Sequence, residues 1–197
     1  YQIYPKSFKD SNGDGIGDLR GVIDALDYLA DMGVDYLWLT PFFVSPQKDN
    51  GYDIADYLAI DPHFGTMDDF DALVKAADAK GLKIMLDMVL CHTSDQHAWF
   101  RRALAGDADY QRYYILRDGR NKKCADAPGE PPTNWQCAFG GSAWQWAPRL
   151  GKWYLHLHDV SQPDLDWTNP TVRDELAKVV RFWKERGVAG FRFDVIN

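Results

Sequence analysis

The feature that most constrains the fold is a repeated order of amphipathic helix, glycine and short apolar run. The apolar runs are residues 34–39, 82–90 and 188–193, and a glycine directly precedes each of them. Continuous hydrophobicity over so few residues is typical of parallel strands that are buried on both faces. The alternation of helix and strand therefore predicts an α/β fold with a parallel sheet and right-handed crossovers.

Apolar residues at helical spacing precede each run. They are Leu19, Val22, Ile23, Leu26 and Leu29, then Phe70, Leu73, Val74 and Ala77, then Val172, Leu176, Val179, Val180 and Trp183. We expect Thr66 to cap the second helix and Asn169 with Pro170 to open the third. Gly33, Gly81 and Gly187 follow the helix ends, where a left-handed residue is favourable.

Two observations favour a barrel over an open, doubly wound sheet. No glycine-rich phosphate-binding turn follows a predicted strand, and polar residues come just after the strand ends, namely Thr40, Asp53, His92 and Asp194. About four βα units are visible where a closed barrel needs about eight. The sequence therefore predicts the N-terminal half of a (β/α)8 TIM barrel.

The segment 93–166 breaks this repeat because it is long, rich in Trp, Gly and Pro, and contains only short helical pieces such as 98–104. We expect a loop-rich insertion after the third strand. The predicted organisation is residues 1–92 for strands one to three, 93–166 for the inserted domain, and 167–197 for the third helix and fourth strand. Aromatic rings in the insertion either contact a sugar or close a small satellite core; they are Trp135, Trp144, Trp146 and Trp153.

Charge and composition exclude several kinds of partner. The net charge is -7, from 22 basic and 29 acidic residues, which argues against nucleic-acid binding. No apolar run reaches the roughly 18–20 residues that a membrane span needs. An odd number of cysteines (Cys91, Cys124 and Cys137) argues against a disulfide-stabilised secreted scaffold, so we expect a cytoplasmic protein.

A carboxylate and a guanidinium lie close together at the end of the last predicted strand. Asp194 ends this strand, and Arg192 lies two residues earlier, on the same face. An aspartate that arginine holds ionised can attack an acetal carbon, as retaining glycoside hydrolysis requires. A salt bridge that only stabilises the barrel end is the alternative.

Further polar residues follow the predicted strands 34–39 and 82–90, which are the second and third when the strand-like stretch YQIY at residues 1–4 is counted as the first. Asp53 lies beside Tyr52, so its carboxylate could bind sugar hydroxyl groups while the ring packs on the sugar face. His92 follows the third strand, which also carries Asp87, and could donate hydrogen bonds to a ligand. A purely structural role is the alternative for the histidine.

The stretch DSNGDGIGD has the pattern of a calcium-binding loop. It places oxygen donors at Asp10, Asn12, Asp14 and Asp18, with the backbone carbonyl of Ile16 as a further ligand. Gly21 stands where a helix-loop-helix calcium site needs a bidentate acid, so that motif is excluded. We expect one structural Ca²⁺ and no organic cofactor; an acidic turn that caps the helix from Leu19 is the alternative.

Together these stretches resemble the alpha-amylase family of glycoside hydrolases over the whole chain. The similarity lies in YQIYPKSF, DSNGDGIGDLRG, GVDYLWLTP, NGYDIADY, DMVLCHTSDQHAWF, FGGSAWQW, QPDLDWTNP and GFRFDVIN. The resemblance implies a retaining α-glucosidase in which Asp194 is the nucleophile, Arg192 orients it, and Tyr52, Asp53 and His92 bind glucose. The general-acid glutamate would follow the fifth strand, after residue 197, so these residues alone would be inactive.

The resemblance also suggests a substrate class. The motif QPDLDW and Val195, which would crowd the leaving-group site, resemble enzymes that cleave α-1,6 bonds, as in isomalto-oligosaccharides. The stretches YPKSF, WLTPFFVSPQKDNGYDI, PPTNWQ and FGGSAW resemble enzymes that cleave trehalose 6-phosphate. Two positions depart from the family pattern: Cys91 replaces the usual Asn, and Asp166 stands where QPDLN is common. A sucrose or maltose isomerase or transglucosylase, and a non-catalytic transporter-accessory relative, are the alternative functions.

Overall fold

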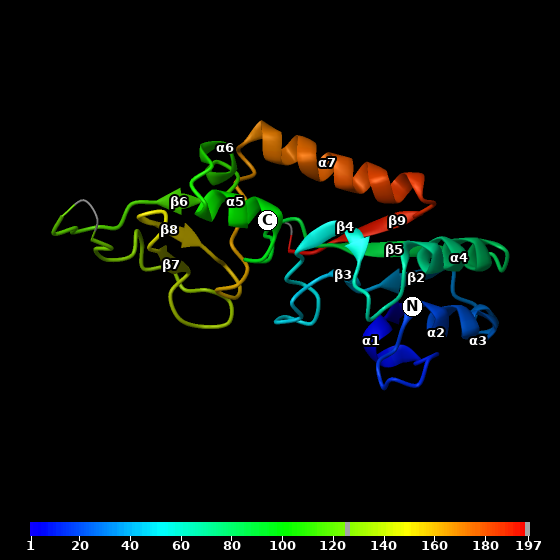
Figure 1. The fold of residues 1–197 in the computed structure, drawn as a ribbon. Coiled ribbons are helices and arrows are strands. Elements are labelled where there is room, and N and C mark those ends of the chain that lie inside the picture. Colours follow the sequence, from blue (N-terminus) through cyan, green and yellow to red (C-terminus); the bar gives the residue numbers. More distant parts are fainter. Residues whose placement is uncertain (125–126, 196–197) are drawn as a thin grey trace. The chain divides into compact units, whose positions relative to one another are not determined.

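The computed structural model describes residues 1–124 and 127–195 (Figure 1). The chain divides into two compact units, which are described separately. Unit 1 comprises Tyr1–Ser45, Asp56–Val89 and, of the described residues, 177–195; unit 2 comprises Pro46–Ala55 and Leu90–Leu176. The domain boundaries at 92/93 and 166/167 stay a prediction.

Helices and strands follow one another along the chain in the alternating manner expected. The helices are α1 (Pro5–Phe8), α2 (Leu19–Asp24), α3 (Leu26–Asp31), α4 (Met67–Asp78), α5 (Ala98–Leu104), α6 (Ala108–Gln111) and α7 (Pro170–Glu185). The strands are β1 (Gln2–Ile3), β2 (Tyr36–Leu39), β3 (Phe43–Val44), β4 (Asp56–Ile60), β5 (Lys83–Met88), β6 (Leu116–Arg117), β7 (Trp144–Ala147), β8 (Lys152–Leu155) and β9 (Gly190–Phe193). None of the helices within 1–124 and 127–195 is long and apolar enough to cross a membrane.

Unit 1 is built on a parallel sheet in the order β1-β2-β5-β9; Figure 1 labels β2, β5 and β9. Each strand pairs with the next parallel strand along the chain, and this neighbour order is the one that a βα barrel requires. The register pairs Leu39 with Leu86 and Asp87 with Arg192. The predicted parallel sheet is therefore confirmed, and the register places the polar residues of β5 and β9 side by side.

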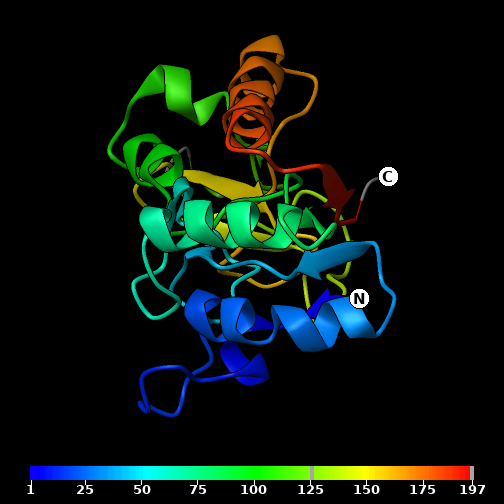
Figure 2. The same cartoon turned by 90° about the vertical axis from the view of Figure 1, so that its right-hand side faces the viewer.

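Local capping explains where the helices of unit 1 begin and end. Thr66 forms a capping box with Asp69, as its position before the helix predicts. The three glycines after the helices have positive φ angles, between 74° and 91°. The predicted helix over 19–29 is wrong in one respect, because it is interrupted at Ala25, which ends α2 and begins α3 (Figure 2).

The core of unit 1 contains a cluster of aromatic rings around Trp183. This side chain is fully buried and packs edge-on against Phe42 and Phe70. Its indole N–H donates to the carbonyl of Tyr57, so its one polar atom is satisfied. Trp183 also packs against Phe43, so the cluster joins α7 to β3, β4 and α4.

Unit 2 contains more regular structure than the sequence predicts. Helix α5 has the predicted bounds, but an antiparallel sheet in the order β6-β8-β7 was not expected. Trp144 and Leu155 form a small core between its strands, and Trp153 packs against that core. A satellite core therefore accounts for these two tryptophans, whereas Trp135 is 53% exposed.

Candidate active site

Two acidic residues of unit 1, Asp87 and Asp194, share one arginine, Arg192. The guanidinium Nη1 of Arg192 lies 2.9 and 3.0 Å from the two oxygens of Asp87 and 2.5 Å from Oδ1 of Asp194. Strand pairing brings Asp87 beside Arg192, and the two-residue repeat of β9 places Asp194 on the same face. The structure therefore brings these three residues together in one charged network.

Burial distinguishes the two carboxylates. The side chain of Asp87 is fully buried, and its Oδ2 also accepts a hydrogen bond from the indole N–H of Trp38, at 3.2 Å. The side chain of Asp194 keeps 17% of its surface exposed, so one carboxylate is accessible and the other is not. A buried, fully engaged Asp87 suits the support of Arg192, and an accessible Asp194 beside the guanidinium suits attack on a substrate.

Backbone strain follows the accessible carboxylate. Val195 has a φ angle of 44°, in the left-handed region that a β-branched residue rarely adopts. Its side chain is 39% exposed. Conformations of this kind cost about 1–3 kcal/mol and persist where the surrounding structure determines them. The backbone therefore leaves the extended conformation at Val195, directly after Asp194.

Tyr52 and His92, two of the predicted sugar-binding residues, are in contact in unit 2. His92 is buried, and its Nε2 lies 3.1 Å from the backbone carbonyl of Tyr52. A carbonyl only accepts, so Nε2 carries the ring proton and donates. Burial, together with the nearby His158, lowers the pKa of His92 to about 4. The ring is therefore neutral near pH 7, with its Nδ1 3.2 Å from Sγ of Cys91.

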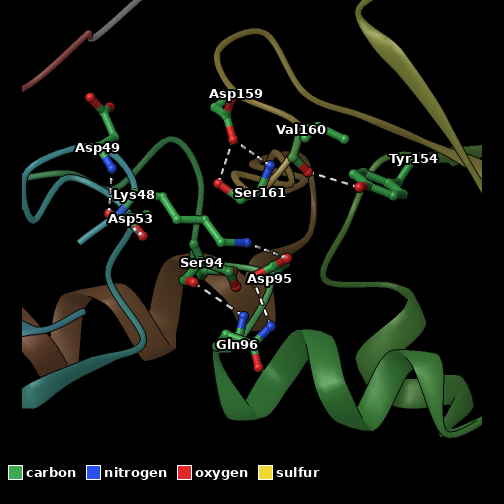
Figure 3. Close-up of polar contacts among 11 residues, drawn as sticks. Lys48, Asp49, Asp53, Ser94, Asp95, Gln96, Tyr154, Asp159, Val160 and Ser161 are labelled. Atoms are coloured by element: carbon green, nitrogen blue, oxygen red, sulfur yellow. Dashed lines mark hydrogen bonds and ion pairs between the residues drawn. The ribbon is translucent and has the colours of Figure 1, made fainter. Parts of the chain in front are cut away.

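Asp53 organises the loop that carries it (Figure 3). It is completely buried, and its two carboxylate oxygens accept hydrogen bonds from the backbone N–H groups of Lys48 and Asp49, each at 3.0 Å. Lys48 in turn forms an ion pair with Asp95, at 3.2 Å. The hydrogen bonds to Asp53 and the ion pair of Lys48 both stabilise this loop. Contacts between Asp53 and a sugar stay a prediction.

A histidine that the sequence analysis did not select lies beside His92. The ring of His158 is centred 5.3 Å from that of His92. Its Nδ1 is buried and has no hydrogen-bond partner among the residues that the structure describes. The sequence signal was present, since His156 and His158 are two residues apart in the segment HLH.

The predicted calcium loop folds around its own side chains. Asp10 accepts hydrogen bonds from the backbone N–H groups of Gly13 and Gly15, and these bonds, led by that of Gly15, lower its pKa. Asp18 caps α2 by accepting from the N–H of Gly21, and its second oxygen accepts from Ser11. Strand β1 and the short helix α1 precede the loop.

The donor set of this loop fits a hard cation in part. The side chains of Asn12 and Asp14 offer oxygens in an exposed segment, as calcium prefers. Both oxygens of Asp18 are already engaged, so its role as a cap is observed. Calcium binding by Asp10, Asn12, Asp14, Ile16 and Asp18 stays a prediction.

The model of the alpha-amylase catalytic domain matches residues 2–197. The chain belongs to the alpha-amylase family. Trehalose-6-phosphate hydrolase of Escherichia coli K12 is 58% identical to it over 197 residues, which is 100% of this chain and 34% of that protein. Oligo-1,6-glucosidase of Parageobacillus thermoglucosidasius is 50% identical over 198 residues, which is again 100% of this chain and 34% of the relative.

A solved structure of a related enzyme is also similar to this chain. The crystal structure of trehalose-6-phosphate hydrolase from Bacillus licheniformis matches with a TM-score of 0.94 at 49% identity, covering 100% of this chain and 35% of that one. The predicted family and fold class, a (β/α)8 barrel, are thereby confirmed, and the relatives are glycoside hydrolases. The chain spans about a third of the length of these relatives.

Proposed function

We propose that the full-length enzyme, meaning a protein of the length of these relatives that contains the 197 residues, is a retaining α-glucosidase acting on trehalose 6-phosphate. The network of Arg192, Asp87 and Asp194 carries the proposal, because it holds an accessible carboxylate against a guanidinium at a strand end. Identity of 58% to one trehalose-6-phosphate hydrolase is the basis for choosing the phosphorylated disaccharide. Isomalto-oligosaccharides are the alternative substrate, because a second trehalose-6-phosphate hydrolase and an oligo-1,6-glucosidase are both 50% identical.

The reaction is a double displacement. Asp194 attacks the anomeric carbon of the terminal glucose and forms a glucosyl ester, while the bond to the bridging oxygen breaks. A general acid, the glutamate expected after the fifth strand, gives that oxygen its proton. Water then cleaves the ester with the same glutamate as base, which regenerates the aspartate and retains the configuration.

The remaining predicted residues bind or select the substrate in this proposal. Tyr52 offers a ring for the sugar face, and Asp53 and His92 are polar groups for its hydroxyls. Val195, next to the nucleophile and 39% exposed, is positioned to restrict the leaving group and thus the linkage. The ligand is a small saccharide. Three cysteines without a disulfide are compatible with the cytoplasmic location that the proposal includes.

The test is hydrolysis of trehalose 6-phosphate, isomaltose and maltose by the full-length enzyme in ¹⁸O-labelled water. We expect the highest kcat/KM for trehalose 6-phosphate, with label in the released glucose. Faster turnover of isomaltose would overturn the substrate assignment. An isomeric disaccharide without label would identify an isomerase, and sugar binding without any turnover would identify a non-catalytic relative.

A pair of variants tests the role of Asp194. Asp194→Asn removes the nucleophile but not the pocket, so kcat should fall by about 10³-fold or more. Asp31→Asn, an exposed position on α3, is the matched control and should behave as wild type. Equal loss in both variants, or none in Asp194→Asn, would contradict the assigned nucleophile.

A further inference from the structure

Three potential metal ligands of unit 2, Cys91, His92 and His158, lie close together. One ligand atom from each of Cys91, His92 and His158 lies within 4.8 Å of the other two. It is the one such group of at least three His, Cys, Asp or Glu residues within 1–124 and 127–195. His92 is buried and the other two are half-buried, so the group lies below the surface without being sealed off.

The distances are near those of a metal site. In a tetrahedral zinc site, a thiolate sulfur and an imidazole nitrogen are about 3.5 Å apart and two imidazole nitrogens about 3.3 Å. Sγ of Cys91 and Nδ1 of His92 are 3.2 Å apart. That pair needs only a small adjustment. The ligand atom of His158 lies within 4.8 Å of the other two, so its ring has to approach them by at most about 1.5 Å for all three to reach one ion.

The hydrogen bonds around His92 prepare its Nδ1 to act as a ligand. Since Nε2 donates to the carbonyl of Tyr52, Nδ1 carries the lone pair that faces Cys91. Histidines that bind metals nearly always donate their second ring N–H in this way, which fixes the tautomer and the ring orientation. The tautomer needed for coordination is therefore already set by the backbone.

His158 supplies a second, independent observation. Its buried Nδ1 has no hydrogen-bond partner in the described part of the chain. Leaving a buried polar atom unsatisfied costs about 1–3 kcal/mol, so such atoms call for an explanation. A hydrogen bond between Cys91 and His92 explains why those two side chains lie together, but it gives the ring of His158 no partner. A ligand bound by all three residues would give the ring of His158 a partner as well.

We propose that Cys91, His92 and His158 form a binding site for one thiophilic divalent ion of the zinc class. One thiolate and two imidazoles favour zinc over the hard cations calcium and magnesium. On binding, the thiol of Cys91 loses its proton to solvent, and sulfur and two ring nitrogens donate electron pairs to the ion without any redox change. Three protein ligands leave a fourth position for water, as in open zinc sites.

The site has a consequence for the sugar that rests on the proposed function. His92 is one of the residues assigned to glucose, and the metal would occupy its surroundings. Zinc and substrate then compete, so the apparent KM for an α-glucoside rises with zinc concentration while kcat stays unchanged. Removal of the metal by a chelator restores the original KM.

The direct test uses Co²⁺ as a spectroscopic probe on the full-length enzyme after treatment with a chelator. We expect a thiolate-to-cobalt charge-transfer band that saturates at one ion per chain and disappears on addition of Zn²⁺. Cys91→Ser should abolish the band, and His158→Ala should weaken Co²⁺ binding by about 10-fold or more. Cys124→Ser, at an exposed cysteine, is the matched control and should keep the band.

The outcomes separate the metal site from the proposed activity. Absence of the band in the wild type, or an equal band in Cys91→Ser, would overturn the site whatever the enzyme hydrolyses. His158 is half-buried, so His158→Ala is expected to fold, and circular dichroism of each variant checks this. A Cys91-dependent band in a protein without glucosidase activity would support the site and reject the proposed function instead.

Discussion

Asp164 is a buried carboxylate with little compensation for its charge. It is 5% exposed, and one oxygen accepts a hydrogen bond from the backbone N–H of Leu157. The described residues provide no ion-pair partner for it. Burial therefore raises the pKa of Asp164 from 3.8 to about 7, although the hydrogen bond from Leu157 opposes the shift. We predict that Asp164→Asn changes the stability of the enzyme in a pH-dependent way.

The sign follows from the direction of the shift. The pKa of Asp164 is raised in the folded state. Its contribution to the stability of the fold is therefore complete below the unfolded pKa of 3.8 and is lost as the pH rises through about 7. Above about pH 7, the difference between the folded and unfolded pKa of Asp164 corresponds to about 4 kcal/mol in the free energy of unfolding. Asn keeps an acceptor for Leu157 but buries two amide N–H donors, which costs about 1–3 kcal/mol at every pH.

The measurable quantity is the difference in Tm between Asp164→Asn and wild type. Between about pH 5 and about pH 8.5, the variant should gain about 3 kcal/mol relative to wild type, because only wild type ionises the buried group. Asp174→Asn, at an exposed position on α7, is the control and should show a constant difference. A difference in Tm for Asp164→Asn that is the same at both pH values would refute the reasoning.

Three further predictions concern other residues. Asp14→Ala should lower the Tm in the presence of calcium but not with a chelator; identical melting curves in both conditions would reject the calcium loop. His97 caps α5 by accepting from the N–H of Trp99, and burial lowers its pKa to about 4, so its contribution is complete above about pH 6.5 and is lost as the pH falls through about 4. His97→Asn keeps an acceptor and should make acid unfolding less steep, which circular dichroism at decreasing pH would measure. Arg192→Lys keeps the charge but cannot reach both Asp87 and Asp194, so kcat/KM should fall by about 10²-fold; a loss below twofold would mean that charge alone suffices.

Much of the fold could be predicted because each local signal agreed with the next. Thr66 stands where a cap was expected, Gly187 ends α7, and the apolar runs became β2, β5 and β9. The shortest elements could not be predicted, because their sequences contain too little of a repeating pattern. Helix α1 has four residues and strand β6 has two, so neither completes enough of a period to be recognised.

The site could be predicted only where neighbours in sequence are also neighbours in space. Arg192 and Asp194 share a face because they lie two residues apart on one strand, and that contact is observed. The engagement of Asp53 by two backbone N–H groups depends on the path of the loop, which no periodicity specifies. His158 contributes through a contact across 66 residues, beyond the reach of any local pattern.

Unit 2 is assembled from two stretches of chain, and this has a consequence for its biosynthesis. Residues 46–55 leave the ribosome first, yet Asp49 accepts a hydrogen bond from Gln162, which is translated 113 residues later. At a translation rate of about 5–20 residues per second, about 6–23 s pass between the synthesis of Asp49 and that of Gln162. During this interval Tyr52 and Asp53 are accessible to chaperones and proteases, so we expect slow codons between residues 55 and 162 to lower the yield of folded protein more than slow codons after residue 176.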